Sequence, residues 1–457
     1  MTGPEEGQEG QEDALLRLTV GEVAHGGHCV ARHEGRVVFV RHALPGEEVL
    51  ARPVQAGPSD RYWRADAVSI LEPSDDRVEP PCPLARPGGC GGCDWQHASL
   101  PAQRRLKARV IREHLTRSAG FDLPDLTVEP VPGDAAGLAW RTRIRFCVDA
   151  SGRAGLHPHR SHAVVPVPEC PLAHPDLSLL RIGQRRWSGV SVVEAVVAGA
   201  GAPSSQTPVP TERLVVLEPR APSGKVSTPP LPDGTSVALL TPEGLRRVRG
   251  RTWVSERVLL DGAPRALRVT GAGFWQVHPG AAQLLLEEVL RVTAPRKGER
   301  ALDLYSGAGL FATGLADAVG PDGAVTAVES DRRAVSDARR NLHGTGWVSL
   351  ETGRVERVLP RLVAHGGLRA DVMVLDPPRV GAGRAVVELL PTLRPRVVAY
   401  VSCDPASLAR DLGYARSAGY RVSGLRAFDA FPMTHHVECV AVLEPVQDQE
   451  RSVELPG

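Results

Sequence analysis

One cysteine and one glutamate near the C-terminal end have the side chains best suited to covalent chemistry. Cys403 follows the apolar run 397–402, and Glu438 closes the run 431–438. An apolar strand that ends in a polar turn brings a thiol to the carboxyl edge of an α/β sheet, where ligands bind. A thiolate and a carboxylate base there suit covalent attack on an electron-poor ring. A single strand-end cysteine is more often a buried packing residue, so the prediction depends on the motifs around it.

The elements that must position this pair follow an alternating pattern from residue 300 onward. Strand candidates cover 300–305, 324–329, 347–351, 370–376 and 397–402, and a clear helix candidate covers 331–343. Strands that alternate with helices are typical of a doubly wound α/β domain with a parallel sheet. Cys403 is therefore expected at the same sheet edge as the residues that end the other strands.

A cofactor site is predicted at that edge. The run Asp303-Leu304-Tyr305-Ser306-Gly307-Ala308-Gly309 follows the first strand and opens a helix, and its glycines let the backbone approach a ligand closely. The second strand ends in Glu329, placed to contact ribose hydroxyls as in dinucleotide enzymes. The fourth strand ends in Asp376-Pro377-Pro378-Arg379, a turn that resembles those of S-adenosylmethionine methyltransferases acting on nucleobases.

The N-terminal part reads as a small β-barrel. Short alternating runs at 16–20, 29–32, 37–40 and 63–68 are separated by glycine and proline turns. Its predicted loops and edges carry basic residues and histidines, which indicate either a nucleic-acid surface or an ordinary solvated one: His25, His28, Arg32, His33, Arg36, Arg41, His42, Arg61 and Arg64.

Two later segments are also basic. The helix predicted at 100–117 has six basic residues and one acid, and the strand candidate 141–148 places Arg141, Arg143 and Arg145 on one face. A stripe of one sign repels itself unless an anion lies across it, and RNA phosphates are the natural partner. An exposed face with scattered counterions is the alternative.

Four of the eight cysteines suggest a metal centre. Cys82, Cys90 and Cys93 lie in a segment rich in proline and glycine, and Cys170 follows much later. Four cysteine thiolates bind either structural zinc or an iron–sulfur cluster, and the spacing leaves both open. The spacing does not match the Cys-x3-Cys-x2-Cys pattern of radical S-adenosylmethionine enzymes.

Composition limits the class of protein. A chain of 457 residues holds two or three domains, and its net charge of +1 gives no global basic field. Apolar runs fall short of the roughly 20 residues that span a bilayer. The acidic start, 1–14, lacks the pattern of a signal peptide and is predicted to be a disordered tail. We expect a cytoplasmic protein without a membrane partner.

On these motifs the C-terminal half resembles the RNA uracil-C5 methyltransferases. The matching runs are Phe274-Trp275-Gln276-Val277, Asp303 to Gly309, Asp376-Pro377-Pro378-Arg379, Ser402-Cys403-Asp404-Pro405, and Phe431-Pro432-Met433-Thr434-His435-His436-Val437-Glu438. The barrel resembles a TRAM domain, an RNA-binding module of this family. Cys82, Cys90, Cys93 and Cys170 resemble the four ligands of a [4Fe-4S] cluster.

The resemblance implies a role for each motif. Cys403 would add to C6 of uracil and make C5 nucleophilic, and Glu438 would accept the C5 proton after methyl transfer. Five residues would bind or line the S-adenosylmethionine pocket: Gln276, Tyr305, Leu310, Glu329 and Asp376. The target base would have to leave its helical stack to reach Cys403.

The resemblance also implies a substrate and shows departures. The family's tRNA-specific branch usually lacks the cluster and barrel, so the expected partner is RNA, most specifically 23S rRNA, with the enzyme a monomer. The alternatives are a tRNA T-loop uracil, methylation of an exocyclic amine, and a non-catalytic RNA-binding protein. Family members often carry Asn at the positions of Leu310, Asp404 and His278, and His at that of Met433. Asp404 should raise the thiol's pKa unless its carboxylate points away or pairs with an arginine.

The predicted organisation has five segments. They are a tail at 1–14, a TRAM-like or OB-like barrel at 15–72, a middle α+β domain at 73–270, a class I methyltransferase domain at 271–445 and a tail at 446–457. Loops are expected at 199–210 and 222–234, where proline, serine and glycine are frequent.

Overall fold

Alternating apolar residues build the N-terminal sheet of the computed structural model, which describes residues 15–199, 211–221 and 224–446. Its strands lie in the order β1-β5-β6-β4-β3-β2 and enclose a core that includes Leu18, Val38 and Val49. The strands are β1 (Leu16–Thr19), β2 (Val23–Ala24), β3 (His28–His33), β4 (Arg36–Arg41), β5 (Glu48–Gln55) and β6 (Trp63–Glu72). The sequence analysis missed β2 and β5. The predicted tail 1–14, all but the first residue of 446–457, and parts of both predicted loops lie outside the described residues.

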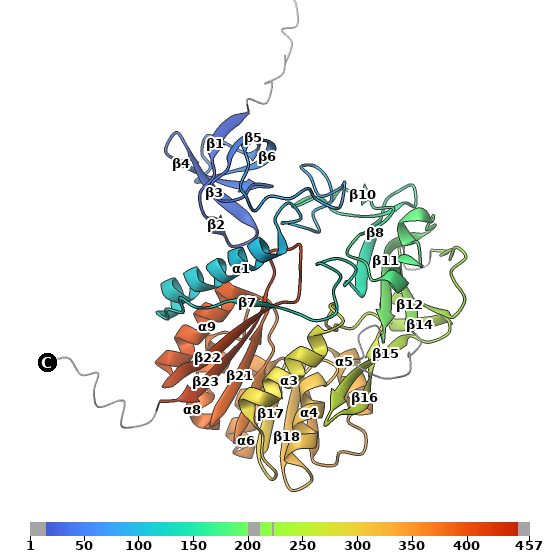
Figure 1. Cartoon of the computed structure of the whole chain (residues 1–457). Helices are drawn as coiled ribbons and strands as arrows, with labels where there is room; N and C mark the ends of the chain where they lie inside the picture. The colour runs from blue at the N-terminus through green and yellow to red at the C-terminus, as the bar shows by residue number, and fades with distance from the viewer. Residues whose placement is uncertain (1–14, 200–210, 222–223, 447–457) are drawn as a thin grey trace, which may run out of the picture.

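The middle of the chain forms a second sheet with the order β10-β9-β8-β11-β12-β13-β14. In Figure 1 it lies in green beside the N-terminal sheet and above the C-terminal one. Its elements are β8 (Arg143–Val148), β9 (Ala154–Leu156), β10 (Val165–Pro166), α2 (Pro175–Ser178), the 3-10 turn η2 (Ile182–Gln184), β11 (Val190–Ala198), β12 (Glu212–Pro219), β13 (Thr235–Thr241) and β14 (Gly244–Arg249). The hairpin β15 (Trp253–Leu260) and β16 (Ala263–Thr270) leads to the last sheet.

The C-terminal sheet confirms the predicted doubly wound α/β fold. Its order is β19-β18-β17-β20-β21-β23-β22-β7, and β17 to β21 run parallel. The strands are β17 (Arg300–Leu304), β18 (Ala324–Glu329), β19 (Val348–Thr352), β20 (Val372–Leu375), β21 (Val397–Ser402), β22 (Tyr420–Asp429), β23 (Glu438–Pro445) and β7 (Val128–Pro130). The chain leaves β17 toward β18 and returns on its other side as β20. Ligands bind at such a switch point.

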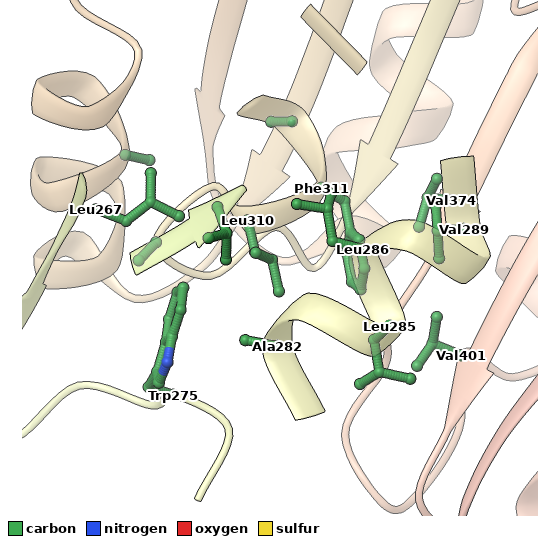
Figure 2. Packing of buried hydrophobic residues seen from close by; sticks show 14 of the residues in the cluster. Leu267, Trp275, Ala282, Leu285, Leu286, Val289, Leu310, Phe311, Val374 and Val401 are labelled. Carbon is green, nitrogen blue, oxygen red and sulfur yellow. The ribbon is translucent and has the colours of Figure 1, made fainter. Parts of the chain in front are cut away.

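Helices cover the faces of this sheet. They are α3 (Ala281–Thr293), α4 (Leu310–Val319), α5 (Arg332–Asn341), α6 (Val355–Gly366), α7 (Arg384–Val387), α8 (Leu390–Leu393) and α9 (Pro405–Ser417). Figure 2 shows Leu286 of α3 beside Phe311 of α4, with Val374 and Val401 of the sheet nearby. These side chains are buried, so the strand ends above them have little freedom to move. Within the described residues no helix is long and apolar enough to cross a membrane.

An upstream segment completes the same sheet. Helix α1 (Leu100–His114), its π-helical extension η1 (Leu115–Ala119) and β7 lie in the segment that the sequence analysis assigned to 73–270. However, Ile111, Leu115 and Val128 pack in one core with Leu412 and Ala427 of the C-terminal sheet. In Figure 1, α1 lies between the N-terminal sheet and the C-terminal sheet.

The basic residues of α1 are mostly engaged within the protein. Lys107 is fully buried, and its Nζ lies 2.5 Å from Oδ1 of Asp429. Arg105 and Arg109 form exposed ion pairs with Asp76 and Glu22. For these three residues the counterions are carboxylates of the protein itself, as the alternative of scattered counterions had stated.

The stripe predicted on 141–148 is corrected in the same way. Arg143 is buried against Glu256 at 3.2 Å, and Arg145 pairs with Glu218 at 2.7 Å. Carboxylates from β12 and β15 therefore supply the counterions, as the alternative had stated. Arg141 lies before β8 and lines the cavity described below.

The buried pair on α1 gives a stability prediction. Lys107→Met leaves Asp429 as an unpaired buried charge, so it should lower the free energy of unfolding by about 3–5 kcal/mol. Arg105→Ala, which breaks an exposed pair, should cost no more than about 1 kcal/mol. Urea denaturation of both variants measures the difference. Equal losses of unfolding free energy in the two variants would show that the buried Lys107–Asp429 pair contributes no more to stability than an exposed pair.

Candidate active site

A cavity of about 1050 Å³ opens at the carboxyl edge of the C-terminal sheet. Every catalytic or cofactor residue proposed from the sequence lines it: Gln276, Tyr305, Leu310, Glu329, Asp376, Cys403 and Glu438. They come from the turns that follow β17, β20 and β21, from the last residue of β18, from the first residues of α4 and β23, and from the segment before α3. Parallel strands bring these turns together because their carboxyl ends meet at one edge.

The turn after β17 is built for close approach to a ligand. Gly307 and Gly309 have φ of 54° and 90°, and Tyr305 adopts φ of 68°, an uncommon conformation for a non-glycine residue. The backbone N–H of Gly307 donates to Oε2 of Glu329 at 3.0 Å. Glu329 thus ties the turn after β17 to the end of β18, and its carboxylate keeps further acceptor sites for hydroxyl groups.

Cys403 lies between the buried strand β21 and helix α9. Burial raises the pKa of its thiol to about 12, with the negative charge of Glu438 acting in the same direction. Arg379, in the turn after β20, lowers that pKa. A thiol in this state remains protonated in the free protein, so the site must favour the thiolate by other means when a ligand is bound.

The position of Asp404 shows whether its carboxylate faces the thiol of Cys403 or points away from it. Its Oδ1 accepts a hydrogen bond from the backbone N–H of Ser407 at 2.8 Å and caps α9. Its Oδ2 lies 3.2 Å from Nε2 of His25, in the turn between β2 and β3. The carboxylate therefore pairs with a histidine rather than an arginine, and among the charges that raise the thiol's pKa it follows Glu438 and Asp376.

Buried carboxyl groups gather at this cavity, and burial raises their pKa values. Glu438 is 3% exposed, and burial together with the charge of Asp376 raises its pKa well above the usual range. Burial and the charge of Glu329 raise the pKa of Asp376 to about 7. Within β17, burial raises the pKa of Asp303 to about 8, although the N–H of Ala312 donates to it. A cationic ligand would relieve the cost of ionising these groups.

The loop 430–437, between β22 and Glu438, is fastened from α1. Gln103 accepts from the N–H of Met433 at 2.7 Å, and Lys107 donates to the carbonyl of Phe431 at 3.0 Å. Met433 has φ of 67°, so its strained backbone is held by these contacts. His435 is held by Asp94, with 2.6 Å between Nδ1 and Oδ2.

Sequence reasoning missed several residues that line the cavity. Arg379 and His436 lie 3.2 Å apart, between Nη2 and Nε2, and both belonged to quoted motifs without being assigned a role. Phe274 is 71% exposed while lining the cavity, and its place before Gln276 was the available signal. His159 comes from the turn after β9, and no sequence signal connected that turn to the site.

The four predicted metal ligands lie in two segments that the fold brings together. The thiols of Cys82 and Cys170 each raise the pKa of Cys90, after burial, so these groups are close in space. Gln96 donates to Sγ of Cys93 at 3.0 Å, and the N–H of Gly92 donates to Sγ of Cys90 at 3.4 Å. Across residues 15–199, 211–221 and 224–446, no group of three or more His, Cys, Asp or Glu side chains is arranged to hold a metal ion.

Comparison with known proteins places these features in context. A family model described as tRNA (uracil-5-)-methyltransferase matches residues 361–446, and a TRAM domain model matches residues 11–54. A protein of Streptomyces avermitilis, named an uncharacterized RNA methyltransferase, is 54% identical and covers 94% of this chain and 98% of its own length. A protein of Streptomyces coelicolor with the same kind of name is 52% identical and covers 94% of this chain and 92% of its own.

A solved structure shares the fold. The tRNA (uracil-54, C5)-methyltransferase of Pyrococcus abyssi, solved with S-adenosyl-L-homocysteine, has a TM-score of 0.65 and 22% identity to this chain. The match covers 93% of this chain and 99% of that one. At this identity the likeness concerns the fold, and it confirms the predicted fold class.

The buried carboxyl groups give a pH prediction for the free protein. Unfolded Asp has a pKa of about 4, so between pH 4 and the raised folded pKa values the folded state holds protons that the unfolded state releases. Stability should therefore fall as pH rises through the window up to about 7 for Asp376 and about 8 for Asp303. Each group contributes a slope of at most about 1.4 kcal/mol per pH unit. Urea denaturation from pH 5 to 8 measures it.

Asp376→Asn should flatten this profile, and Asp322→Asn, at an exposed position, serves as the matched control. Identical slopes for wild type and Asp376→Asn would contradict the assignment of Asp376 as a group that is protonated in the folded state.

Proposed function

The chain belongs to the uracil-5-methyltransferase family of RNA methyltransferases, and from this premise we propose that it methylates C5 of a specific uracil through a covalent adduct with Cys403. The observation that carries the proposal is one cavity lined by a thiol, a buried carboxyl group and the residues of the cofactor motifs. Methylation of an exocyclic amine would need no thiol in that cavity. A non-catalytic RNA-binding protein would need neither the thiol nor the buried carboxyl group.

The cofactor is S-adenosylmethionine, which supplies an electrophilic methyl group on a cationic sulfonium. Gln276, Tyr305, Glu329 and Asp376 would hold it, and Leu310 would line its pocket. The buried carboxyl groups support this proposal, because ionised Asp376 beside a cation loses much of the penalty that raises its pKa. Figure 2 shows Leu310 near Trp275, in the segment that also carries Gln276.

Cys403 would be the nucleophile. Its sulfur, once deprotonated, forms a bond to C6 of uracil, and the electrons of the C5–C6 double bond make C5 able to attack the methyl group. Arg379 favours the thiolate, because its positive charge lowers the thiol's pKa. The turn between β21 and α9 directs the residue into the cavity, and the N-cap at Asp404 fixes where that turn ends.

Glu438 would accept the C5 proton. Loss of this proton restores the C5–C6 double bond as the bond from C6 to Cys403 breaks, which frees the enzyme. A carboxylate whose pKa is raised by burial is a stronger base than an exposed one. Strand pairing supports the arrangement: β23 lies antiparallel to β21, with Ser402 opposite Cys439, so the nucleophile's turn and Glu438 meet at the same end.

RNA is the substrate, and we propose 23S rRNA as the specific one. The N-terminal TRAM domain and the four-cysteine segment support this choice, since they are the features that separate the predicted rRNA branch from the tRNA branch. The alternative is a tRNA T-loop uracil, because the Pyrococcus abyssi protein that shares the fold is named for tRNA uracil-54.

We also propose that Cys82, Cys90, Cys93 and Cys170 bind a [4Fe-4S] cluster. The thiols fit as a donor set, because N–H groups already donate to two of the sulfurs, and such bonds tune iron–sulfur centres. A zinc site would instead need all four sulfurs to bind a single ion, with Zn–S distances of about 2.3 Å. Such a cluster would have a structural role, because its cysteine ligands would join the loop 82–93 to the middle sheet.

A trapping experiment tests the catalytic proposal. RNA containing 5-fluorouracil has no C5 proton to lose, so the wild-type enzyme with S-adenosylmethionine should form a stable protein–RNA adduct, visible on a denaturing gel. Cys403→Ala should form no adduct, and its rate of methyl transfer should fall at least about a thousandfold, because no nucleophile adds to C6. Transcripts of 23S rRNA and tRNA, each with 5-fluorouracil, distinguish the two substrates.

Glu438→Gln provides the matched variant in the same assay. With ordinary uracil RNA it should accumulate the adduct that wild type resolves, because no group accepts the C5 proton. Full turnover by Cys403→Ala would remove the covalent mechanism, and normal turnover by Glu438→Gln would remove Glu438 from its role.

The cluster proposal is tested by metal content. Protein purified without oxygen should contain about four iron and four sulfide per chain, and Cys90→Ala should lose most of both with its visible absorbance. Cys147→Ala, at a cysteine outside the set, should leave them unchanged. Stoichiometric zinc in place of iron would contradict the proposal.

A further inference from the structure

The N-terminal barrel contacts the turn that carries the proposed nucleophile. His25, which follows β2, lies with Nε2 at 3.2 Å from Oδ2 of Asp404. Asp404 is the next residue after Cys403, and its other carboxylate oxygen caps α9 through the N–H of Ser407. The pair joins residues from opposite ends of the chain, and each side chain is partly shielded, at 39% and 21% exposed.

The contact is built into the fold rather than left to a flexible side chain. In the same loop Gly27 has φ of 80°, and a Cβ there would lie 2.9 Å from Cβ of Asp94 and 3.1 Å from Cβ of His435. Trp95 donates from its indole nitrogen to the carbonyl of Gly27 at 3.2 Å. Only glycine permits this approach, so the loop is held against the segments at 94–95 and 435.

A carboxylate beside a nucleophilic thiol opposes formation of the thiolate. Burial alone would raise the pKa of Asp404, but hydrogen bonds from His25 and Ser407 outweigh it and hold the pKa below its usual range. Asp404 is therefore a negative charge next to Cys403. Its direction, toward His25 and the start of α9, decides how much of that charge acts on the thiol.

Other charged groups face the same three residues. Glu438 of β23, Asp376 and Arg379 act on Cys403. The ring of His25 contacts His114 of α1 at 5.3 Å and His435 at 6.2 Å between centroids. Within the described residues, His25 is the ion-pair partner of Asp404.

We propose that His25 is a positioning residue for the nucleophile: it holds the Asp404 carboxylate away from Cys403, so that the barrel completes the active site. The inference rests on the proposed role of Cys403. It gives the TRAM domain a second task besides contact with RNA, because displacement of the barrel loop would expose the thiol to the charge of Asp404.

A double-mutant cycle tests the inference. The rate at which iodoacetamide alkylates Cys403 is measured against pH without RNA or cofactor, with the modified peptide identified by mass spectrometry. His25→Ala should shift this pH profile upward by about one unit, which is a tenfold slower reaction at a given pH. Asp404→Asn in the same background should return the profile to within about 0.3 unit of the Asp404→Asn single variant.

The control is His33→Ala, a histidine of the same barrel that stacks near Trp63 and should leave the profile unchanged. A His25→Ala shift that Asp404→Asn does not abolish overturns the inference, as does a profile equal to that of wild type. If His25→Ala displaces the barrel, seen as a change in tryptophan fluorescence, His25→Gln is measured with the same rescue and the same criteria.

The assay separates this inference from the proposed function. Alkylation needs no methyl transfer, so a coupled His25–Asp404 pair remains measurable even if Cys403→Ala keeps its activity and the covalent mechanism fails. Conversely, formation of the 5-fluorouracil adduct with independent effects of His25 and Asp404 would leave the mechanism intact and remove the inference.

Discussion

The buried ion pair between Lys107 and Asp429 is the interaction on which the arrangement of the site depends. The two side chains are 0% and 2% exposed, and they join α1 to the end of β22 across 322 residues of sequence. Two desolvated charges tolerate little displacement, because each is costly to bury without the other. One turn earlier on α1, Gln103 holds Met433. The loop that leads to Glu438 is therefore fixed from outside the sheet that carries it.

This constraint also explains how the barrel reaches the active site. On α1, Lys107 faces the C-terminal sheet, whereas Ala102 and Val110 belong to the core of the N-terminal barrel. Helix α1 therefore packs against both the N-terminal barrel and the C-terminal sheet. Because the Lys107–Asp429 pair holds α1 in place, the barrel loop at 25–27 contacts Asp404 and His435. Three segments from distant parts of the chain thus meet in one site, and precise placement of reacting groups is what catalysis by proximity requires.

Charge has two separate uses in this protein. Carboxyl groups are gathered at the buried end of the cavity, where they raise one another's pKa and favour a cation. Basic residues are spread through the upstream elements, and many are neutralised inside the molecule, such as Arg143 by Glu256. The net charge of the chain, +1, reveals neither the gathered carboxyl groups nor the paired basic residues. The basic stripe predicted on 141–148 was wrong for this reason: the acids that pair with it lie on strands distant in sequence, and no local pattern reveals them.

The sequence by itself determined the sheet edge and the residues on it. The motifs from Asp303 to Cys403 that end the parallel strands were sufficient for the fold class and for the cavity residues they carry, because parallel strands must align their carboxyl ends. Glu438, at the start of the antiparallel β23, and Gln276, before α3, came from the family resemblance. Only the tertiary structure decided which partners these residues have. That Asp404 turns toward His25, that α1 and β7 complete the C-terminal sheet, and that Lys107 is buried all depend on contacts between distant segments. Periodicity reports which face of an element is apolar, whereas pairing between elements is set by packing and by the cost of burying a charge alone.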